Sequence, residues 1–347
     1  MSETIRLEAG NPADIDRAAE LLRAGRLVAF PTETVYGLGA NALSPEAVAG
    51  IFAAKQRPAW DPLIVHIASV QEIDGIANVP DELRGCVEQL AAAFWPGPLT
   101  LLLPRSAAVP DAVTAGRPLV GVRVPAHPTA QALLRATGLP IAAPSANRFG
   151  HTSPTTAEHV LADLGGRIDA VLDAGPTDVG IESTVVDVTR TPIVQYRPGA
   201  ITPQQIEKAC GLPVEVYALR SDEKNAGEPK SLPSPGVGIR HYAPRARVVL
   251  AEGSPEGLRR KMQEINVAVD GAARVGVLLP IGWRLSGIAV VQPWASWDQP
   301  GRLAATLFAG LRALDARGVE QIVCPLPPAG GVYDAIRDRL MKAAREH

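Results

Sequence analysis

The chain has 347 residues, of which 34 are Lys or Arg and 36 are Asp or Glu, so its net charge is −2. This near-neutral charge and an aromatic content of only 4% argue against a broad nucleic-acid surface and against a platform that stacks single-stranded bases. Three cysteines without a CxxC pair do not make a disulfide framework. With no apolar leader and no apolar run of membrane length, the sequence predicts a cytoplasmic protein of two domains.

Residues 1–212 contain both short apolar runs and helical segments, and we predict that they form one domain. Strands are predicted at residues 27–30, 63–67, 99–103, 120–124, 141–143, 170–172, 184–188 and 193–196. Helices are predicted from Ser44, where Ser and the following Pro45 suit the N-cap and first turn, and over residues 128–136, 156–164 and 203–209. Because strands and helices do not alternate strictly, we expect a mixed α/β layer fold.

Residues 213–245 contain a polar stretch rich in Pro and Gly, the composition of an exposed linker, and we expect it to fold over a binding cleft as a lid. Residues 246–347 form a second predicted domain, with strands at 248–250, 275–279, 288–291 and 321–324 and helices at 302–317 and 333–345. Its nearly continuous apolar runs favour a parallel sheet covered on both faces. Residues 1–212 carry a net charge of −6 and the remainder +4, so neither part is basic enough for a polyanion surface.

Five polar segments accompany the strands of the first domain: residues 31–39 (PTETVYGLG), 55–66 (KQRPAWDPLIVH), 120–125 (VGVRVP), 144–153 (PSANRFGHTS), and 181–187 with 196–199 (IESTVVD and YRPG). Taken singly, each is also typical of a surface turn or of a solvated charge pair at a helix end. Ligands of α/β proteins bind where strands end. The five together, rich in Lys, Arg, Ser, Thr and Asn, therefore predict one anion-lined cleft.

The cations of these segments suggest the chemistry. Lys55 and Arg57 offer a point charge and a planar fork to a phosphate chain. Arg123 lies inside an apolar strand and needs an anion, which is either an internal Asp or Glu or the carboxylate of a ligand. The sequence has no GxxxxGK[ST], GxGxxG or GxSxG motif and no zinc spacing. This pattern favours a mechanism of positioning and electrostatics over covalent catalysis.

The five segments, in this order, resemble the YrdC/Sua5 family of threonylcarbamoyl-AMP synthases, and residues 234–244 (SPGVGIRHYAP) resemble its two-domain Sua5 form. The resemblance implies a twisted mixed sheet with a large concave cleft, and a smaller Rossmann-like α/β domain after the linker. It implies that L-threonine, bicarbonate or CO2, and ATP are converted to threonylcarbamoyl-AMP and pyrophosphate, with Mg²⁺ accompanying ATP. A separate transferase would use the product to form N6-threonylcarbamoyladenosine at position 37 of tRNA, without stable nucleic-acid or membrane binding by this chain. An RNA-binding or regulatory module of the YrdC type is the alternative.

The resemblance also implies residue roles, with Lys55 and Arg57 as the catalytic residues. The implied ATP site comprises Lys55, Arg57, Asp61, Leu119, Ser145, Asn147, Ser153, Arg197, His241 and Tyr242. The implied threonine site comprises Thr34, His66, Arg123, Ala143 and Ser183. In this site Arg123 would bind the carboxylate of the amino acid. No protein side chain is expected to ligate a metal. Asp61 stands where the family commonly has Asn, and we expect its carboxylate to pair with Arg57 or to approach Mg²⁺.

Overall fold

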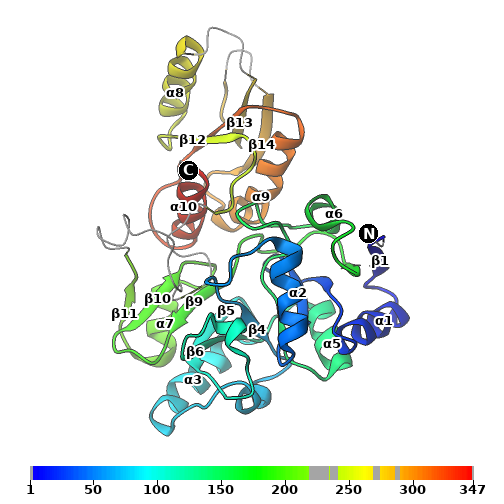
Figure 1. Cartoon of the computed structure of the whole chain (residues 1–347). Helices are drawn as coiled ribbons and strands as arrows, with labels where there is room; N and C mark the ends of the chain where they lie inside the picture. The colour runs from blue at the N-terminus through cyan, green and yellow to red at the C-terminus, as the bar shows by residue number, and fades with distance from the viewer. Residues whose placement is uncertain (1–2, 219–233, 235–240, 269–273, 286–289, 346–347) are drawn as a thin grey trace. The chain divides into compact units, whose positions relative to one another are not determined.

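A computed structural model describes residues 3–218, 234, 241–268, 274–285 and 290–345. The chain falls into two compact units, whose elements are labelled in Figure 1. The first comprises Met1–Phe149, Pro154–Asp178 and Glu182–Gly238, and the second comprises Gly150–Ser153, Val179–Ile181 and Ile239–His347. Most of the predicted lid, residues 219–233 and 235–240, lies outside the described residues, so its closure stays a prediction.

Among the described residues, the first unit is built on a mixed sheet of eleven strands in the order β1-β8-β2-β3-β7-β4-β6-β5-β9-β10-β11. The strands are β1 (Ile5–Glu8), β2 (Val28–Pro31), β3 (Tyr36–Asn41), β4 (Ile64–His66), β5 (Leu99–Pro104), β6 (Leu119–Arg123), β7 (Ile141–Ala142), β8 (Ala170–Asp173), β9 (Thr184–Asp187), β10 (Ile193–Arg197) and β11 (Val214–Val216). Parallel pairs such as β4 with β6 occur beside antiparallel pairs such as β2 with β3. The expected mixed sheet is confirmed, but β11 pairs with β10 and extends the sheet past residue 212, into the segment predicted as linker.

Helices cover both faces of this sheet, and the strand β2 contributes to a core on each face. Val28 and Phe30 pack in one cluster with α1 and α5, whereas Ala29 belongs to a larger cluster with α2, α3, α6 and α7. This follows from the alternation of side chains along a strand. The helices of the unit are α1 (Pro12–Arg23), α2 (Pro45–Lys55), the 3₁₀ helix η1 (Val70–Gly75), α3 (Asp81–Phe94), α4 (Asp111–Thr114), α5 (Pro128–Thr137), α6 (Ala157–Leu164) and α7 (Pro203–Cys210). None of the helices in the described part of the chain is both long and apolar enough to span a membrane.

Local sequence explains where the helices begin and end. Ser44 caps α2 by accepting a hydrogen bond from the N–H of Ala47, with Pro45 in the first turn. At α7, Thr202 and Gln205 form the predicted capping box. Helix α5 ends at Gly138, whose φ of +64° is readily adopted by glycine.

Residues 31–39 are not the surface turn that their polar composition also allowed. Every residue from Thr32 to Gly39 is buried, and β3 pairs antiparallel with β2. A Cβ atom at Gly39 would lie 2.9 Å from Phe30 Cε1 and 3.1 Å from the carbonyl oxygen of Val28, so the close approach of the strands requires glycine. The segment is therefore a buried hairpin whose connection carries residues 32–35.

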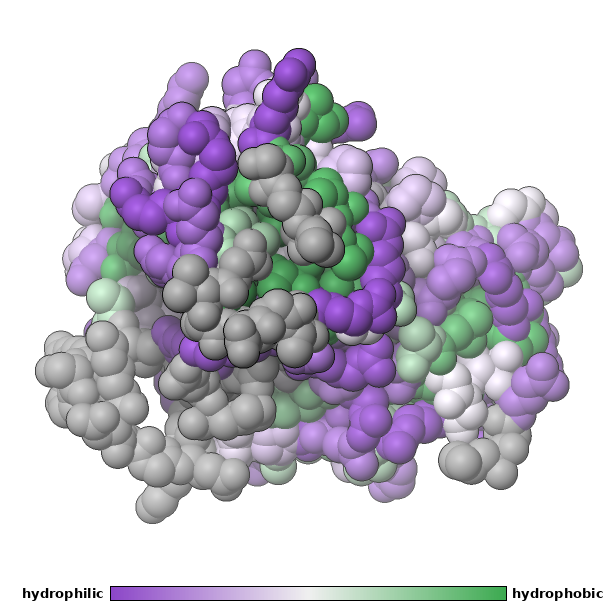
Figure 2. Space-filling view, turned by 90° about the horizontal axis from the view of Figure 1, so that it is seen from above, coloured by the Kyte–Doolittle hydropathy of each residue, from purple (hydrophilic) through white to green (hydrophobic). Residues whose placement is uncertain are grey.

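The second unit contains a parallel sheet, in which the described strands follow the order β12-β15-β13-β14. The strands are β12 (Arg247–Ala251), β13 (Val275–Ile281), β14 (Val290–Ser296) and β15 (Gln321–Pro325), and the helices are α8 (Pro255–Ala268), α9 (Pro300–Ala316) and α10 (Val332–Ala343). The prediction of a small parallel α/β domain is confirmed. Some of its apolar side chains remain exposed, notably Ile281 and Val291. Figure 2 shows apolar residues exposed between hydrophilic ones on the face seen from above.

Candidate functional site

Lys55 is the last residue of α2 and lies inside the protein. Its side chain is 1% exposed, and Nζ donates hydrogen bonds to the backbone carbonyl oxygens of Ser145 and Asn147. Burial and the charge of Arg57 lower the pKa of Lys55 well below its usual range, while the charge of Asp61 opposes this change. The alternative of a solvated charge pair at a helix end is therefore wrong for Lys55.

Arg57 and Asp61 form a buried ion pair. Arg57 Nη2 lies 3.0 Å from Asp61 Oδ2, and neither side chain is more than 3% exposed. Arg57 also donates through Nε to the carbonyl oxygen of Asp61 at 3.1 Å and through Nη2 to that of Pro62 at 2.6 Å. Of the two expectations for Asp61, the pairing with Arg57 is confirmed.

The chain that follows β7 connects these cations to the buried hairpin and to β4. The N–H of Ala143 donates to the carbonyl oxygen of Ile64 at 2.9 Å, two residues before His66. Ser145 forms a β-bridge with Gly37, where a Cβ atom would lie only 3.2 Å from that of Ala143. Three of the segments singled out in the sequence are therefore in direct contact.

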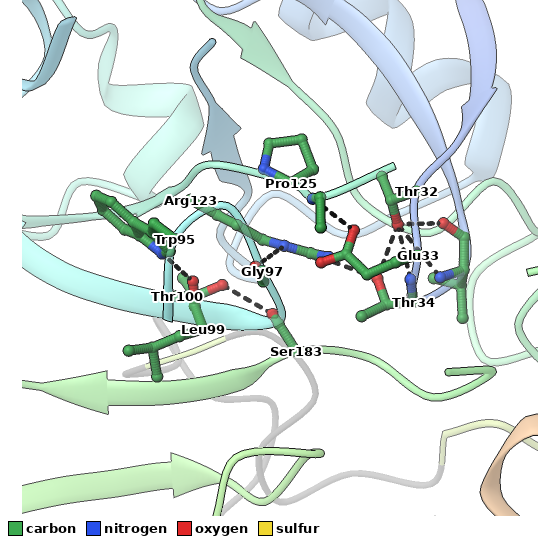
Figure 3. Close-up of polar contacts among 12 residues, drawn as sticks. Thr32, Glu33, Thr34, Trp95, Gly97, Leu99, Thr100, Arg123, Pro125 and Ser183 are labelled. Atoms are coloured by element: carbon green, nitrogen blue, oxygen red, sulfur yellow. Dashed lines mark hydrogen bonds and ion pairs between the residues drawn. The ribbon is translucent and has the colours of Figure 1, made fainter. Parts of the chain in front are cut away.

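Arg123 ends β6 and has an internal counter-ion (Figure 3). Its Nη2 lies 2.7 Å from Glu33 Oε1, its Nη1 donates to Thr34 Oγ1 at 2.9 Å, and its Nε donates to the carbonyl oxygen of Gly97 at 3.2 Å. The sequence left an internal carboxylate and the carboxylate of a ligand open as partners of this arginine, and the structure shows the internal one. Leu119, at the opposite end of β6, packs against a small apolar cluster, and its contact with the nucleotide stays a prediction.

His66 is the neighbour of Arg123 in the register of β4 and β6. Its side chain is buried, and the ring of Phe30 approaches it edge-on with the ring centroids 6.3 Å apart. Burial and the nearby charges of Arg123 and Arg197 lower the pKa of His66 to about 3. At neutral pH this imidazole is therefore uncharged and suited to accept or donate a hydrogen bond rather than to bind an anion by charge.

Ser183, the residue before β9, contacts Arg197 at the end of the neighbouring strand β10. Arg197 donates through Nη2 to Ser183 Oγ at 3.0 Å and through Nε to the carbonyl oxygen of Ser183 at 2.9 Å. The Ser183 hydroxyl also lies 2.7 Å from Thr100 Oγ1 in β5, as Figure 3 shows. Ser183, which is expected to bind threonine, and Arg197, which is expected to bind ATP, therefore belong to one hydrogen-bonded group.

Three of the residues predicted to bind ATP belong to the second unit: Ser153, His241 and Tyr242. Tyr242 is buried, stacks on Phe308 with the ring centroids 5.7 Å apart, and has the guanidinium of Arg339 5.1 Å from its ring centroid. The His241 ring lies 4.2 Å from that of Tyr242. These contacts fix both side chains within the second unit, and their role toward ATP stays a prediction.

Sequence reasoning missed Glu33 and Thr100. Glu33 accepts a hydrogen bond from the N–H of Ala126 through Oε2 at 3.0 Å, in addition to its ion pair with Arg123. A signal existed for Glu33, because a buried arginine needs a carboxylate and residues 31–39 contain only this one. Thr100 lies within an apolar strand and gave no comparable signal.

In the described part of the chain, no group of three or more His, Cys, Asp or Glu side chains could hold a metal ion. The Asp61 carboxylate beside Lys55 and Arg57 is already engaged in an ion pair. The side chains gathered here are instead mainly cations and hydroxyls, which suit anionic ligands.

Comparisons with known proteins assign the chain. Residues 20–199 match the Sua5/YciO/YrdC family model, described as "Telomere recombination", and residues 201–345 match the threonylcarbamoyl-AMP synthase C-terminal domain. The chain belongs to the Sua5/YciO/YrdC family. Threonylcarbamoyl-AMP synthase of Bacillus subtilis is 45% identical over 338 residues, which cover 96% of this chain and 94% of the relative. That of Pyrococcus abyssi is 42% identical over 332 residues, which cover 94% and 93%.

A solved structure supports the same assignment. Pyrococcus abyssi Sua5, in a complex with L-threonine, is similar with a TM-score of 0.87 and 41% sequence identity, over 99% of this chain and 98% of that chain. The match includes both the mixed sheet and the C-terminal α/β domain. The fold is therefore that of a two-domain member of the Sua5/YciO/YrdC family.

The buried ion pair of this family member predicts a stability effect. Replacing Asp61 by Asn keeps the side-chain shape but removes the carboxylate that is paired with the buried guanidinium of Arg57. We expect the free energy of unfolding to fall by about 3–5 kcal/mol, measured by urea denaturation. Asp111→Asn is the matched control, because Asp111 is exposed and its pair with Arg105 is worth about 0–1 kcal/mol. Equally small losses in the two variants would contradict this account of Asp61.

The neutral state of His66 predicts a pH-dependent stability. Its folded pKa of about 3 lies below the ordinary value of 6.5, so the unfolded state binds more protons between these values and stability falls as the pH drops through this window. Between pH 7 and pH 5 this group alone should remove about 2 kcal/mol. Urea denaturation of the wild type and of His66→Gln at both pH values measures the effect, because the variant lacks this contribution. A stability difference between the two proteins that does not change with pH would refute the neutral, buried imidazole.

Proposed function

We propose that this chain is a threonylcarbamoyl-AMP synthase, which converts L-threonine, bicarbonate or CO2, and ATP into threonylcarbamoyl-AMP and pyrophosphate. The reaction class is nucleotidyl transfer, because AMP passes from ATP to the carbamate of threonine. The product would serve the formation of N6-threonylcarbamoyladenosine in tRNA by a separate transferase.

The observation that carries this proposal is the junction of two buried polar groups in the first unit. The backbone of residues 143–147 accepts hydrogen bonds from Lys55 and contacts the hairpin that holds Thr34 against Arg123. The residues that we assign to phosphate thus lie next to those that we assign to the amino acid. The names of the relatives support the same reaction, since those of Bacillus subtilis and Pyrococcus abyssi are threonylcarbamoyl-AMP synthases and a Pyrococcus abyssi Sua5 structure contains L-threonine.

The chemistry proceeds in two steps. The amine of threonine adds to CO2 and loses a proton, which gives a carbamate. A carbamate oxygen then attacks the α-phosphorus of ATP, the bond to the bridging oxygen breaks, and pyrophosphate leaves with the bonding electron pair. No side-chain nucleophile is needed, so the protein acts by alignment and by charge.

The carbamate and ATP are both anions and repel each other, and the cations of the site would offset this repulsion. We assign Lys55 and Arg57 to the phosphates and to the charge that develops on pyrophosphate, with Arg197 between the two reactants. Arg123 and Thr34 would hold the carboxylate and hydroxyl of threonine, beside the neutral ring of His66. Ser145 and Asn147 would contribute polar groups at the phosphates, and Ser183 would contribute its hydroxyl at threonine.

Mg²⁺ would enter with ATP and neutralise part of the phosphate charge. Its ligands would be chiefly phosphate oxygens, in keeping with the lack of a cluster of metal-ligating side chains among the described residues. The three cysteines are free thiols, which fits a reducing compartment and makes the cytoplasm the proposed location.

An RNA-binding module is less compatible with the same residues. Phosphate backbones are bound by exposed cations, whereas the cations of this site are buried: Lys55, Arg57, Arg123 and Arg197. The Tyr242 ring, a potential surface for stacking a base, is likewise buried.

The decisive experiment measures pyrophosphate release from ATP with and without threonine and bicarbonate. We expect release only when both are present, because the attacking group is the carbamate. D-Threonine is a matched control that carries the same charges with the opposite configuration. Release without threonine would refute the proposed function.

Variants of the two groups should fail differently. Lys55→Ala should raise the KM for ATP or lower kcat by about 10- to 100-fold, since it removes a charge-assisted contact to phosphate. Arg123→Ala should raise the KM for threonine by a similar factor and change that for ATP little. Lys208→Ala, which removes an exposed cation from α7, is the control. Equal changes for both substrates in each variant would contradict the separation.

A further inference from the structure

Glu33 lies among the polar contacts shown in Figure 3, and the proposed reaction assigns it no role. Its residue is 7% exposed. One carboxylate oxygen, Oε2, is held by the N–H of Ala126, and the other, Oε1, lies 2.7 Å from Nη2 of Arg123. The carboxylate is therefore fixed by one oxygen and directed toward the guanidinium by the other.

The contact between Glu33 and Arg123 leaves hydrogen-bonding capacity on both groups. Although 2.7 Å separates Oε1 from Nη2, neither atom makes a directional hydrogen bond within the described part of the chain. Buried polar atoms are normally hydrogen-bonded, and a polar ligand that supplies such bonds gains free energy. An unsatisfied acceptor thus lies directly beside an unsatisfied donor.

This arrangement complements an α-amino acid. The ammonium and carboxylate of such a ligand are bonded to the same carbon, so protein groups that bind both must lie close together. Arg123 supplies the cation and Glu33 supplies the anion, and Thr34 Oγ1 accepts a hydrogen bond from Arg123. A lone arginine would bind any carboxylate, whereas the pair favours a ligand that carries the ammonium as well.

We propose that Glu33 binds the ammonium group of the substrate while Arg123 binds its carboxylate, so that the pair selects α-amino acids over other carboxylates. This inference rests on the proposed function, because it takes L-threonine as the ligand. Glu33 also fixes Arg123 when no ligand is bound. Substrate binding then exchanges the ion-pair contact between two side chains for two directional, charge-assisted hydrogen bonds.

The test compares two ligands by isothermal titration calorimetry. One is L-threonine, and the other is the 2,3-dihydroxybutanoate of matching configuration, in which a hydroxyl replaces the ammonium. The wild type should bind threonine at least about tenfold more tightly. Glu33→Gln should weaken threonine binding by about 10- to 100-fold and leave the affinity for the hydroxy acid unchanged or increased.

Controls separate this role from a structural one. Glu207→Gln is the matched control, because Glu207 also accepts a backbone N–H, that of Val214 at 2.9 Å. Glu33→Asp keeps the charge and should retain the preference for threonine even if its absolute affinity falls. The affinity for ATP should stay unchanged in Glu33→Gln, which shows that the fold is intact.

Equal affinity of the wild type for the two ligands would overturn the inference, as would a loss in Glu33→Gln that is the same for both. Tighter threonine binding by Glu33→Gln would also overturn it, since Glu33 would then merely compete with the ligand for Arg123. A wild type that binds neither compound would instead refute the proposed function itself. Failure of this inference and failure of the proposed function therefore give different results.

Discussion

Burial of positive charge is the constraint on which the first unit depends. No more than 8% of the residue is exposed in any of its four site cations, Lys55, Arg57, Arg123 and Arg197. An unpaired buried charge is strongly unfavourable, so the fold must supply fixed partners. It supplies carboxylates to Arg57 and Arg123 and backbone carbonyl oxygens to Lys55.

The mixed topology of the sheet brings these partners together. Strand β7 is only two residues long and lies between β3 and β4, antiparallel to both. The chain leaves the sheet at Ala143 and presents the carbonyl oxygens of residues 145 and 147 to Lys55. On the next strands, the turn after β2 sets Glu33 against the end of β6, where Arg123 lies. Short strands that end beside one another thus create the site.

Sequence reasoning predicted the features that depend on local spacing. The strand before Pro31, the cap at Ser44 and the Arg57–Asp61 pair, four residues apart, were all accessible in this way. It missed α1, α3 and α8, although the buried residues of α1 and α3 recur at helical spacing, and β3, whose glycines are unusual in a strand. The partner of Arg123 lies 90 positions earlier, so only the three-dimensional pairing of strands identifies it.

The different partners of the cations follow from the chemistry of the two residue types. A guanidinium cannot lose its proton in a protein, so buried Arg57 and Arg123 each require a carboxylate. Burial lowers the pKa of Lys55, so its charge is less fixed than that of an arginine, and its ammonium group is held by backbone carbonyl oxygens. A bound phosphate would stabilise the charged form of Lys55, so phosphate binding and proton uptake are linked at this residue. Lysine at position 55, held by backbone carbonyl oxygens, thus couples its protonation to a bound anion, whereas the arginines stay charged beside their carboxylates whether or not a ligand is bound.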